Sequence, residues 1–359
     1  IYVIGAVTFG YSLIMLLRPV LIRHAISNED RSHAWEIIRM YGRTALARYA
    51  VLDDKQFFFS SGGSLVSYVV ENRVALALGD PIGLQADVPS AIAEFQNFSS
   101  LNDWQVAFYQ VMPDHLEIYK SAGFGALTLG QESIVDLSTF TMDGSENKTL
   151  RNSYNKMVRS GYHSDVINPP FSPRMLHELK SISDDWLASR ATSEIRFSLG
   201  WFDEPYLNTC PVLIVRDREG FIEAFANIVT EFQANEVAVD LMRHRSQVES
   251  GLMDFLFVSL FQWAKEEGHA TFNLGLSALS GVGEHSADPA IERALYYIYR
   301  NINRIYNFRG IHEFKQKFHP MLSPRYLIYP GPASLPAVSV ALLNASLGGG
   351  LLRYIIPRN

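Results

Sequence analysis

The most informative stretch of this sequence is Val237-Ala238-Val239-Asp240-Leu241-Met242-Arg243-His244-Arg245. Its apolar residues alternate, which predicts a β-strand over Glu236 to Leu241. On such a strand Val237, Val239 and Leu241 share one face, and Asp240 points to the opposite face. The stretch therefore predicts an apolar strand that carries one acid near its end.

Asp240 is a candidate for chemistry because of this environment. An ionised carboxylate in an apolar strand is costly unless it has a partner, and Arg243 is close enough in sequence to be one. The pair has two interpretations. It is either a structural ion pair that closes the strand, or a carboxylate that acts as a general base or orients a hydroxyl. The residues alone leave both open.

Helical and strand-like segments alternate on both sides of this strand. The expected helices cover residues 34–49, 89–98, 113–122, 173–189 and 251–267. The other expected strands cover residues 56–59, 64–70, 73–78, 105–110, 211–216, 222–230 and 271–274. Strands that meet helices in this order predict an α/β fold with mixed layers. The two halves share this rhythm, which suggests a duplicated domain with a join near residues 161–173.

Composition narrows the function classes. The chain has 359 residues and a formal net charge of −6, and its length predicts about two domains. Apolar residues make up 48% and charged residues 19%, which excludes a disordered or collagen-like chain. The single cysteine, Cys210, excludes a disulfide framework and a cysteine-based zinc site. The histidines show no ligand spacing, so no metal is expected. Phosphate-loop, dinucleotide-binding, HExxH and GxSxG motifs are absent from the sequence.

Both ends of the sequence are apolar. Residues 1–17 carry no charge and are followed by Arg18, Arg23 and His24, which predicts a transmembrane or interfacial helix over residues 1–24. Its cationic end is expected on the cytoplasmic side. A buried core helix is the alternative. Residues 336–359 form an apolar C-terminal tail, which could lie on a membrane surface or pack against the protein.

Two groups of cationic residues are further candidates. Residues 148–163 contain four Lys or Arg and no acid, so this expected helix could meet phosphates of RNA or of anionic lipid. Lys315 and Lys317 lie in a second expected helix that places Phe314 and Phe318 on one face. A lysine beside a reacting ester can stabilise developing negative charge. For both helices the alternative is a solvated face.

Ten short motifs occur in a fixed order along the chain. They are GDPIG (79–83), FSLG (197–200), AFAN (224–227), VDLMRHR (239–245), GLMDFLF (251–257), FNLG (272–275), LSG (279–281), YNF (306–308), FKQKFHP (314–320) and PRYL (324–327). Together they resemble the C-terminal domain of bacterial aminoacyl-phosphatidylglycerol synthases, the multiple peptide resistance factor family. The resemblance extends from about Tyr41 to Leu327, which is most of the chain.

The resemblance implies two tandem acyltransferase-like (GNAT) domains, over residues 28–165 and 170–330, each a mixed sheet flanked by helices. It also implies an upstream membrane domain that ends with residues 1–24, a bacterial cell-membrane location and a cytoplasmic catalytic part. The implied reaction moves Lys or Ala from aminoacyl-tRNA to the glycerol hydroxyl of phosphatidylglycerol. The product lowers the negative charge of the membrane and gives resistance to cationic antimicrobial peptides.

The resemblance also implies roles for single residues. Asp240 would orient or deprotonate the lipid hydroxyl, Arg243 would pair with a phosphate or with Asp240, and Lys315 or Lys317 would stabilise the ester oxyanion or contact the terminal ribose. The implied substrate-binding residues are Asn273, Tyr306, Asn307 and Arg325. The residues expected to face the tRNA are Lys148, Arg151, Lys156 and Arg159.

No cofactor is expected beyond aminoacyl-tRNA as co-substrate. Ordinary GNAT enzymes bind the pyrophosphate of coenzyme A on a glycine-containing loop. Here the corresponding residues are 245–251, whose first glycine comes late and whose Glu249 would repel a pyrophosphate. Two other functions stay open: an aminoacyltransferase of the same fold that acts on a peptidoglycan precursor, and a non-catalytic lipid- or RNA-binding module. A homo-oligomer formed through the membrane domain is also open.

Overall fold

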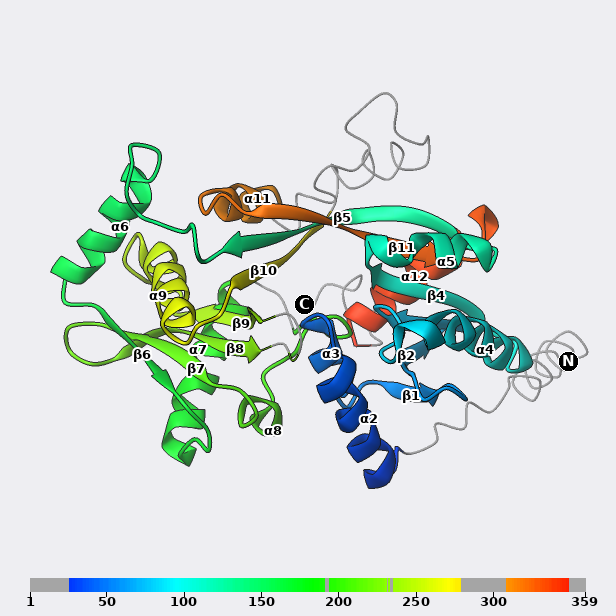
Figure 1. Ribbon diagram of the computed structural model, residues 1–359. Helices are drawn as coiled ribbons and strands as arrows, with labels where there is room; N and C mark the ends of the chain where they lie inside the picture. Colours follow the sequence, from blue (N-terminus) through cyan, green and yellow to red (C-terminus); the bar gives the residue numbers. More distant parts are fainter. Residues whose placement is uncertain (1–25, 191–193, 231, 233–234, 279–307, 349–359) are drawn as a thin grey trace, which may run out of the picture.

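The computed structural model describes residues 26–190, 194–230, 232, 235–278 and 308–348. Within these ranges eleven strands form one continuous mixed sheet in the order β1-β2-β3-β4-β11-β5-β10-β9-β8-β7-β6 (Figure 1). The strands are β1 (Gln56–Phe59), β2 (Leu65–Glu71), β3 (Val74–Leu78), β4 (Gln105–Val111), β5 (Gly125–Asp136), β6 (His163–Ile167), β7 (Val212–Arg216), β8 (Ile222–Thr230), β9 (Glu236–His244), β10 (Thr271–Ala278) and β11 (Met321–Tyr329).

Helices cover both faces of this sheet. The α-helices are α2 (Asn28–Tyr41), α3 (Leu46–Tyr49), α4 (Val88–Leu101), α5 (Leu116–Ser121), α6 (Lys148–Arg159), α7 (Pro173–Ser189), α8 (Glu204–Leu207), α9 (Leu252–Glu266), α11 (Phe308–Gln316) and α12 (Leu335–Ser346). Short 3₁₀ turns are η1 (Gln85–Asp87), η2 (Pro113–His115) and η3 (Pro332–Ser334). The predicted α/β class, with a mixed sheet flanked by helices, is confirmed.

Each half of the sheet contains one parallel strand pair whose members are joined by a helix. In the first half β3 pairs with β4 and the connection is α4; in the second half β9 pairs with β10 and the connection is α9. The first parallel pair packs against α4 and α5 on one face and against α12 on the other. In the second half α9 and α6 cover one face and α7 covers the opposite face.

The middle of the sheet is built from long strands that the sequence did not predict. β11 runs antiparallel to both β4 and β5, so residues 321–329 hydrogen-bond with strands that precede them by more than half of the chain. β5 pairs with β11 along one edge and with β10 along the other, and this links the two halves of the sheet. β5 could not be predicted because its apolar and polar residues do not alternate regularly. It includes Gly130 at φ 143° and the buried polar residue Glu132.

One helix predicted from the sequence is divided in the structure, and another is confirmed. The helix predicted over residues 34–49 is two helices, because the backbone adopts an extended conformation at Gly42. The N–H of Gly42 donates to the carbonyl of Ile38 and ends the first helix. A side chain at Gly42 would place its Cβ 2.6 Å from that carbonyl oxygen. The helix predicted over residues 173–189 is confirmed as α7. The hydroxyl of Ser172 accepts a hydrogen bond from the Met175 N–H, which caps its start.

The apolar ends of the sequence are only partly described. The segment predicted to enter the membrane, residues 1–24, lies outside the described residues. None of the helices within the described ranges is long and apolar enough to cross a membrane. The predicted C-terminal tail begins with α12, whose Leu335, Val338 and Ala341 are buried against the sheet. Val340 and Leu343 of the same helix are exposed.

Candidate active site

A β-bulge in β9 changes the predicted arrangement around Asp240. Two β9 residues stand opposite Asn227 of β8, since Val239 pairs with Ile228 and Met242 pairs with Ala226. The side-chain amide oxygen Oδ1 of Asn227 accepts a hydrogen bond from the Leu241 N–H at 2.7 Å, which satisfies the backbone group that the bulge displaces.

The bulge reverses the faces of the residues that follow it. Leu241 packs with the core cluster around α7, whereas Val237 and Val239 pack with α9, so the prediction that all three share one face was wrong. Asp240 and Arg243 both contact groups on the α7–α8 side, although they are three positions apart on one strand. The extra residue of the bulge explains why strict alternation fails here.

Asp240 accepts two hydrogen bonds through a single oxygen. Its Oδ2 atom receives the hydroxyl of Tyr206 at 2.8 Å and the N–H of Gly200 at 2.9 Å. Asn227 donates to the Tyr206 hydroxyl at 3.2 Å and so fixes that hydroxyl as a donor toward the carboxylate. The second oxygen, Oδ1, is buried and has no hydrogen-bond partner within the described residues. It is the atom on which a substrate proton can be placed.

Burial raises the pKa of Asp240 to about 6, although the hydrogen bonds from Tyr206 and Gly200 and the charge of Arg243 lower it. The pKa of Tyr206 is raised well above its ordinary value, mainly by burial and by the nearby Asp240, so its hydroxyl stays protonated. A carboxyl that exchanges its proton close to neutral pH is suited to general acid–base catalysis.

Arg243 is held by an acid and by an aromatic ring rather than by Asp240. Its Nη2 donates to Glu194 at 2.6 Å, and its guanidinium lies 4.1 Å from the centre of the Trp186 ring. The guanidinium of Arg190 lies 4.2 Å from the centre of the same ring. No atom pair of Arg243 and Asp240 lies within ion-pair distance among the described contacts, which argues against the simple structural ion pair.

The strands β9 and β10 separate beside Asp240. They pair only from Glu236 with Thr271 to Ala238 with Asn273, although both strands continue. β10 pairs with β5 on both sides of an irregularity at Leu274 and Gly275, where Gly275 has φ 79°. We call the place where the two strands part the opening, because ligands of α/β sheets commonly bind beyond the carboxyl ends of such strands. Asp240 follows the last paired residue on one side of this opening, and Gly275 follows it on the other.

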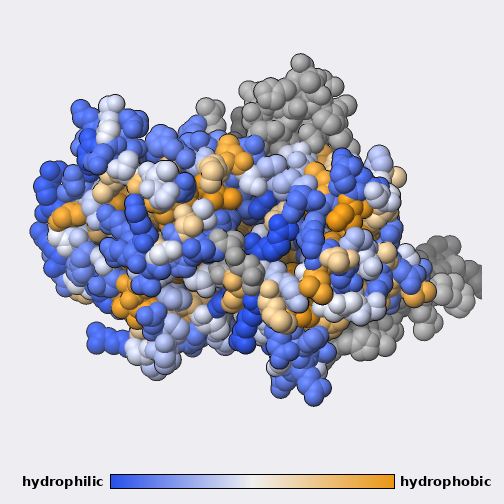
Figure 2. All heavy atoms as spheres, in the orientation of Figure 1, coloured by the Kyte–Doolittle hydropathy of each residue, from blue (hydrophilic) through white to orange (hydrophobic). Residues whose placement is uncertain are grey.

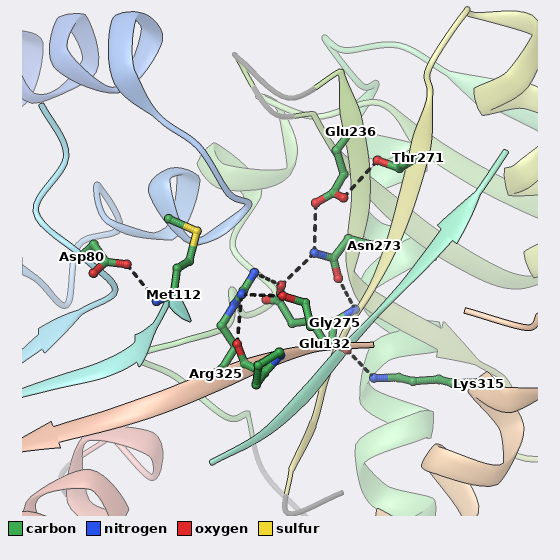
Figure 3. A network of polar contacts seen from close by, with 11 residues as sticks. Asp80, Met112, Glu132, Glu236, Thr271, Asn273, Gly275, Lys315 and Arg325 are labelled. Carbon is green, nitrogen blue, oxygen red and sulfur yellow. Dashed lines mark hydrogen bonds and ion pairs between the residues drawn. The ribbon is translucent and has the colours of Figure 1, made fainter. Parts of the chain in front are cut away.

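Lys315 of α11 reaches this opening. It is buried, and its Nζ donates to the carbonyls of Gly275 at 2.9 Å and Leu276 at 3.1 Å (Figure 3). Burial lowers the pKa of Lys315 to about 8, against the opposing effect of the Glu132 charge. An ammonium has three donors, so one remains beyond those that the carbonyls of Gly275 and Leu276 accept within the described residues.

A buried polar network lies next to Lys315 where β5, β9, β10 and β11 meet (Figure 3). Arg325 forms an ion pair with Glu132, and both side chains are nearly inaccessible to solvent. Asn273 donates to Glu132 at 3.2 Å and to Glu236 at 3.0 Å. Thr271 donates to the second oxygen of Glu236 at 3.0 Å. Asn273 and Arg325, predicted to bind substrate, are therefore brought together through Glu132.

Lys317 lies in a different environment from Lys315. Its Nζ is 2.9 Å from Oδ1 of Asp254 on α9, and 41% of its side chain is exposed. The geometry thus separates the two lysines that the sequence left as alternatives, because only Lys315 lies beside the opening between β9 and β10. Tyr306 and Asn307, also predicted to bind substrate, lie outside the described residues.

The predicted tRNA-binding residues all belong to α6. Lys148 and Arg159 are exposed, Lys156 pairs with Glu249, and Arg151 donates to the carbonyls of Met142 and Gly144. The surface over this helix, at the left of the view, is strongly hydrophilic (Figure 2). Arg151 therefore has a structural task in holding the preceding loop, while the other three present charge near the surface.

Sequence reasoning missed several members of the site. Tyr206, Glu194 and Trp186 lie far from Asp240 in the sequence, and no spacing rule connects them. Glu132 lies in an unpredicted strand. Glu236 belongs to the buried network through Asn273 and Thr271, whereas Glu223 lies near Arg245. The described residues contain no group of three or more metal-ligating side chains.

Known proteins are similar in sequence to this chain over most of its length. The family described as phosphatidylglycerol lysyltransferase, C-terminal, matches residues 35–329. A phosphatidylglycerol lysyltransferase of Bacillus subtilis (strain 168) is 39% identical over 308 residues, which are 86% of this chain and 36% of that protein. The protein of the same name from Staphylococcus xylosus is 33% identical over 314 residues, 87% of this chain and 37% of that protein. The chain thus spans about a third of the length of these curated relatives.

Solved structures share the fold. L-PGS from Bacillus licheniformis has a TM-score of 0.81 at 36% identity, and the match covers 90% of this chain and 97% of that one. A C-terminal domain (DUF2156) from Agrobacterium fabrum has a TM-score of 0.79 at 34% identity, with 89% and 97% covered. FemX, at 10% identity over 87% of this chain and 98% of that one, has a TM-score of 0.54, which is a likeness of fold alone.

Proposed function

Because this chain belongs to the family of phosphatidylglycerol lysyltransferase C-terminal domains, we propose that it transfers an amino acid to the glycerol hydroxyl of phosphatidylglycerol. Aminoacyl-tRNA is the proposed donor. Lysine is the first amino acid to test, because the curated relatives that match carry a lysyltransferase name. The observation that carries the proposal is Asp240, a buried carboxyl with a pKa of about 6 beside an opening in the sheet.

In the proposed reaction the aminoacyl carbonyl carbon exchanges the ribose oxygen of the tRNA for the glycerol oxygen of the lipid. One ester bond replaces another, and no net charge is created. Oδ1 of Asp240 takes the proton of the glycerol hydroxyl as that oxygen attacks the aminoacyl carbonyl. The bond to the ribose oxygen of the tRNA then breaks, and the proton returns from Asp240 to that leaving oxygen. Asp240 ends the cycle ionised, as it began. Its pKa near neutrality serves both proton transfers.

Lys315 is the proposed electrostatic group of the reaction. The tetrahedral intermediate carries negative charge on the former carbonyl oxygen, and a preorganised donor in a buried site stabilises such charge strongly. The side chain of Lys315 is fixed by two backbone carbonyls, so its remaining N–H has a defined direction. Arg243, fixed by Glu194 and Trp186, is the proposed partner of the lipid phosphate.

The surroundings of the reaction follow from this proposal. A lipid acceptor requires the domain to work at a membrane, and we propose its cytoplasmic face, with α6 turned toward the tRNA phosphates. Lysyl transfer replaces a negative headgroup by one of positive net charge. We therefore propose that the product weakens the attraction of cationic antimicrobial peptides to the membrane.

The test supplies the protein with phosphatidylglycerol vesicles and radiolabelled lysyl-tRNA or alanyl-tRNA, and separates the lipid extract on thin layers. A labelled lipid that disappears after ribonuclease pretreatment is the expected result, and the tRNA that gives it identifies the amino acid. Asp240→Asn should abolish the product. Asp53→Asn is a matched control, because Asp53 is exposed and forms a surface ion pair with Arg31.

Two other results would redirect the proposal. Label that appears only when a peptidoglycan precursor with a free amine is added would establish that precursor as the acceptor. A folded protein that binds vesicles and tRNA but forms no labelled product, alone or within the full-length protein, would indicate a binding module.

A further inference from the structure

One short segment connects the candidate active site with the first half of the sheet. We name residues 194–201 the connecting segment. Its first residue, Glu194, holds Arg243, and the N–H of Gly200 holds Asp240. At Arg196 the segment also donates its N–H to the carbonyl of Ser346 in α12 at 2.9 Å. Both proposed catalytic side chains of β9 therefore depend on where this segment lies.

The connecting segment contains a strained residue. Phe197 has φ 72°, and the N–H of Ser198 donates to the carbonyl of Arg196 at 3.0 Å across it. This is the rare form of the γ-turn, in which the central residue has positive φ. A bulky residue does not adopt this backbone unless its surroundings hold it there, and such strain gathers at functional sites.

The surroundings that hold Phe197 come from residues just before β1. Oδ2 of Asp54 accepts the Phe197 N–H at 3.1 Å. Oδ1 of the same carboxylate lies 2.6 Å from Nζ of Lys55, and that ammonium lies 5.3 Å from the centre of the Phe197 ring. The Tyr109 ring of β4 packs against Phe197 from a further direction, at 5.7 Å between centres.

Lys55 is an unusual lysine because its side chain has no exposed surface. Its burial lowers its pKa, and the nearby Arg196 lowers it further, while Asp54 opposes both effects. A buried ammonium is stable only where interactions with a well-placed partner offset the free-energy cost of its desolvation. Here that position is against the carboxylate and the ring that fix the γ-turn.

We propose that Asp54 and Lys55 are positioning residues for Asp240, acting through the γ-turn at Phe197 and the N–H of Gly200. The inference rests on the proposed function, since it assigns a catalytic task to Asp240. Only two residues separate Phe197, which Asp54 holds, from Gly200, which binds Asp240. The segment has little freedom between them, because a Cβ on Gly200 would lie 2.2 Å from Oδ2 of Asp240.

The charged groups around Asp240 define what should be measured. Tyr206 of α8, Arg243 of its own strand and Glu194 of the connecting segment face it, and Cys210 lies nearby. Burial raises the pKa values of Tyr206 and Cys210, so both stay protonated through neutral pH. The hydrogen bond from Gly200 favours the ionised form of Asp240. Loss of this hydrogen bond should raise the pKa of Asp240 and move the acid limb of the pH–activity profile to higher pH.

The experiment measures kcat/KM for lysyl transfer to phosphatidylglycerol vesicles from pH 5.5 to 8.5 in the full-length protein and its variants. For Asp54→Ala we expect the acid limb to move from about pH 6 to about pH 7. Activity then falls about fivefold at pH 6 and by less than about 1.2-fold at pH 8. Asp54→Asn keeps an acceptor for the Phe197 N–H and should shift the limb by less than half as much.

Controls separate this role from a general loss of structure. Asp53→Asn makes the same chemical change one residue away, on an exposed side chain, and should leave the profile unchanged. If Asp54→Ala does not fold, as judged by circular dichroism, Lys55→Met decides in its place. It keeps the apolar stem against the Phe197 ring but removes the ammonium, and its acid limb should also move upward.

Three outcomes overturn the proposal. A loss of equal size at pH 6 and pH 8 would indicate a merely structural role, and an unchanged profile in Asp54→Ala, or in Lys55→Met where that variant decides, would remove the role altogether. Both results require a wild-type protein that transfers lysine, so they refute this inference alone. A wild-type protein without transfer refutes the proposed function and this inference with it.

Discussion

Replacing Asp240 by Asn is expected to stop transfer and, at the same time, to stabilise the folded protein above neutral pH. The pKa of Asp240 is raised from the ordinary 3.8 to about 6, mainly by burial. Well below pH 3.8 the carboxyl is protonated in both folded and unfolded states, and it adds no penalty. As the pH rises through 6 it ionises in the folded state, and the full cost of the buried charge appears.

The size of the effect follows from the shift. A rise of about two units corresponds to about 3 kcal/mol at 1.36 kcal/mol per unit. Asn is neutral at every pH, so it removes this cost. Its amide N–H₂ would occupy the place of Oδ1, which is buried and has no hydrogen-bond partner among the described residues, and leaving this N–H₂ unpaired costs about 1–2 kcal/mol. We therefore expect Asp240→Asn to be about 1–2 kcal/mol more stable than the wild type at pH 8.

The assay is urea unfolding followed by circular dichroism at pH 4 and pH 8, alongside the transfer assay. At pH 4 the order should reverse, because only a small part of the Asp240 penalty is present there while the Asn amide still lacks a partner. Transfer should fall by about 10²–10⁴-fold in the same variant. A variant that is less stable than the wild type by the same amount at both pH values would refute the reasoning, because the buried carboxylate would then carry no cost.

The other site residues give predictions of different kinds. Lys315→Met should lower kcat by about 10²–10³-fold and remove the alkaline limb near pH 8, since burial lowers the pKa of Lys315 to about 8 and its charged form is the active one. Lys317→Met should leave kcat within about twofold and cost about 1 kcal/mol or less of stability, as urea unfolding would record, because its pair with Asp254 is partly exposed. Replacing exposed Lys148 and Arg159 of α6 by Gln should raise KM for aminoacyl-tRNA and reduce the slope of log KM against log salt by about one for each lost phosphate contact. An unchanged salt slope would remove α6 from the tRNA interface.

The sequence predicted the strands and helices whose patterns are regular. The alternation of β9 and the capped start of α7 are local properties, and both elements appear in the structure. β11 could not be found in this way, because its place between β4 and β5 depends on pairing with distant residues.

The candidate site was predictable only in part, for the same reason. Asp240 could be singled out because an acid in an apolar strand is conspicuous in a sequence. Its partners Tyr206 and Gly200 reach it through tertiary contacts, and the bulge opposite Asn227 changes which residues share a face. Lys315 could be proposed but not separated from Lys317, because a helical pattern does not say which neighbour faces a buried opening.

The place of β11 has a consequence for how the protein is made. On the ribosome, β1 to β5 emerge long before residues 321–329, yet β11 fills the gap between β4 and β5. The facing edges of β4 and β5 therefore stay unpaired until residues 321–329 have been synthesised, and such edges invite wrong pairing. Completion of the first half and closure of the sheet beside the candidate active site become a single late event in biogenesis. A truncated product without β11 would keep these two strand edges exposed.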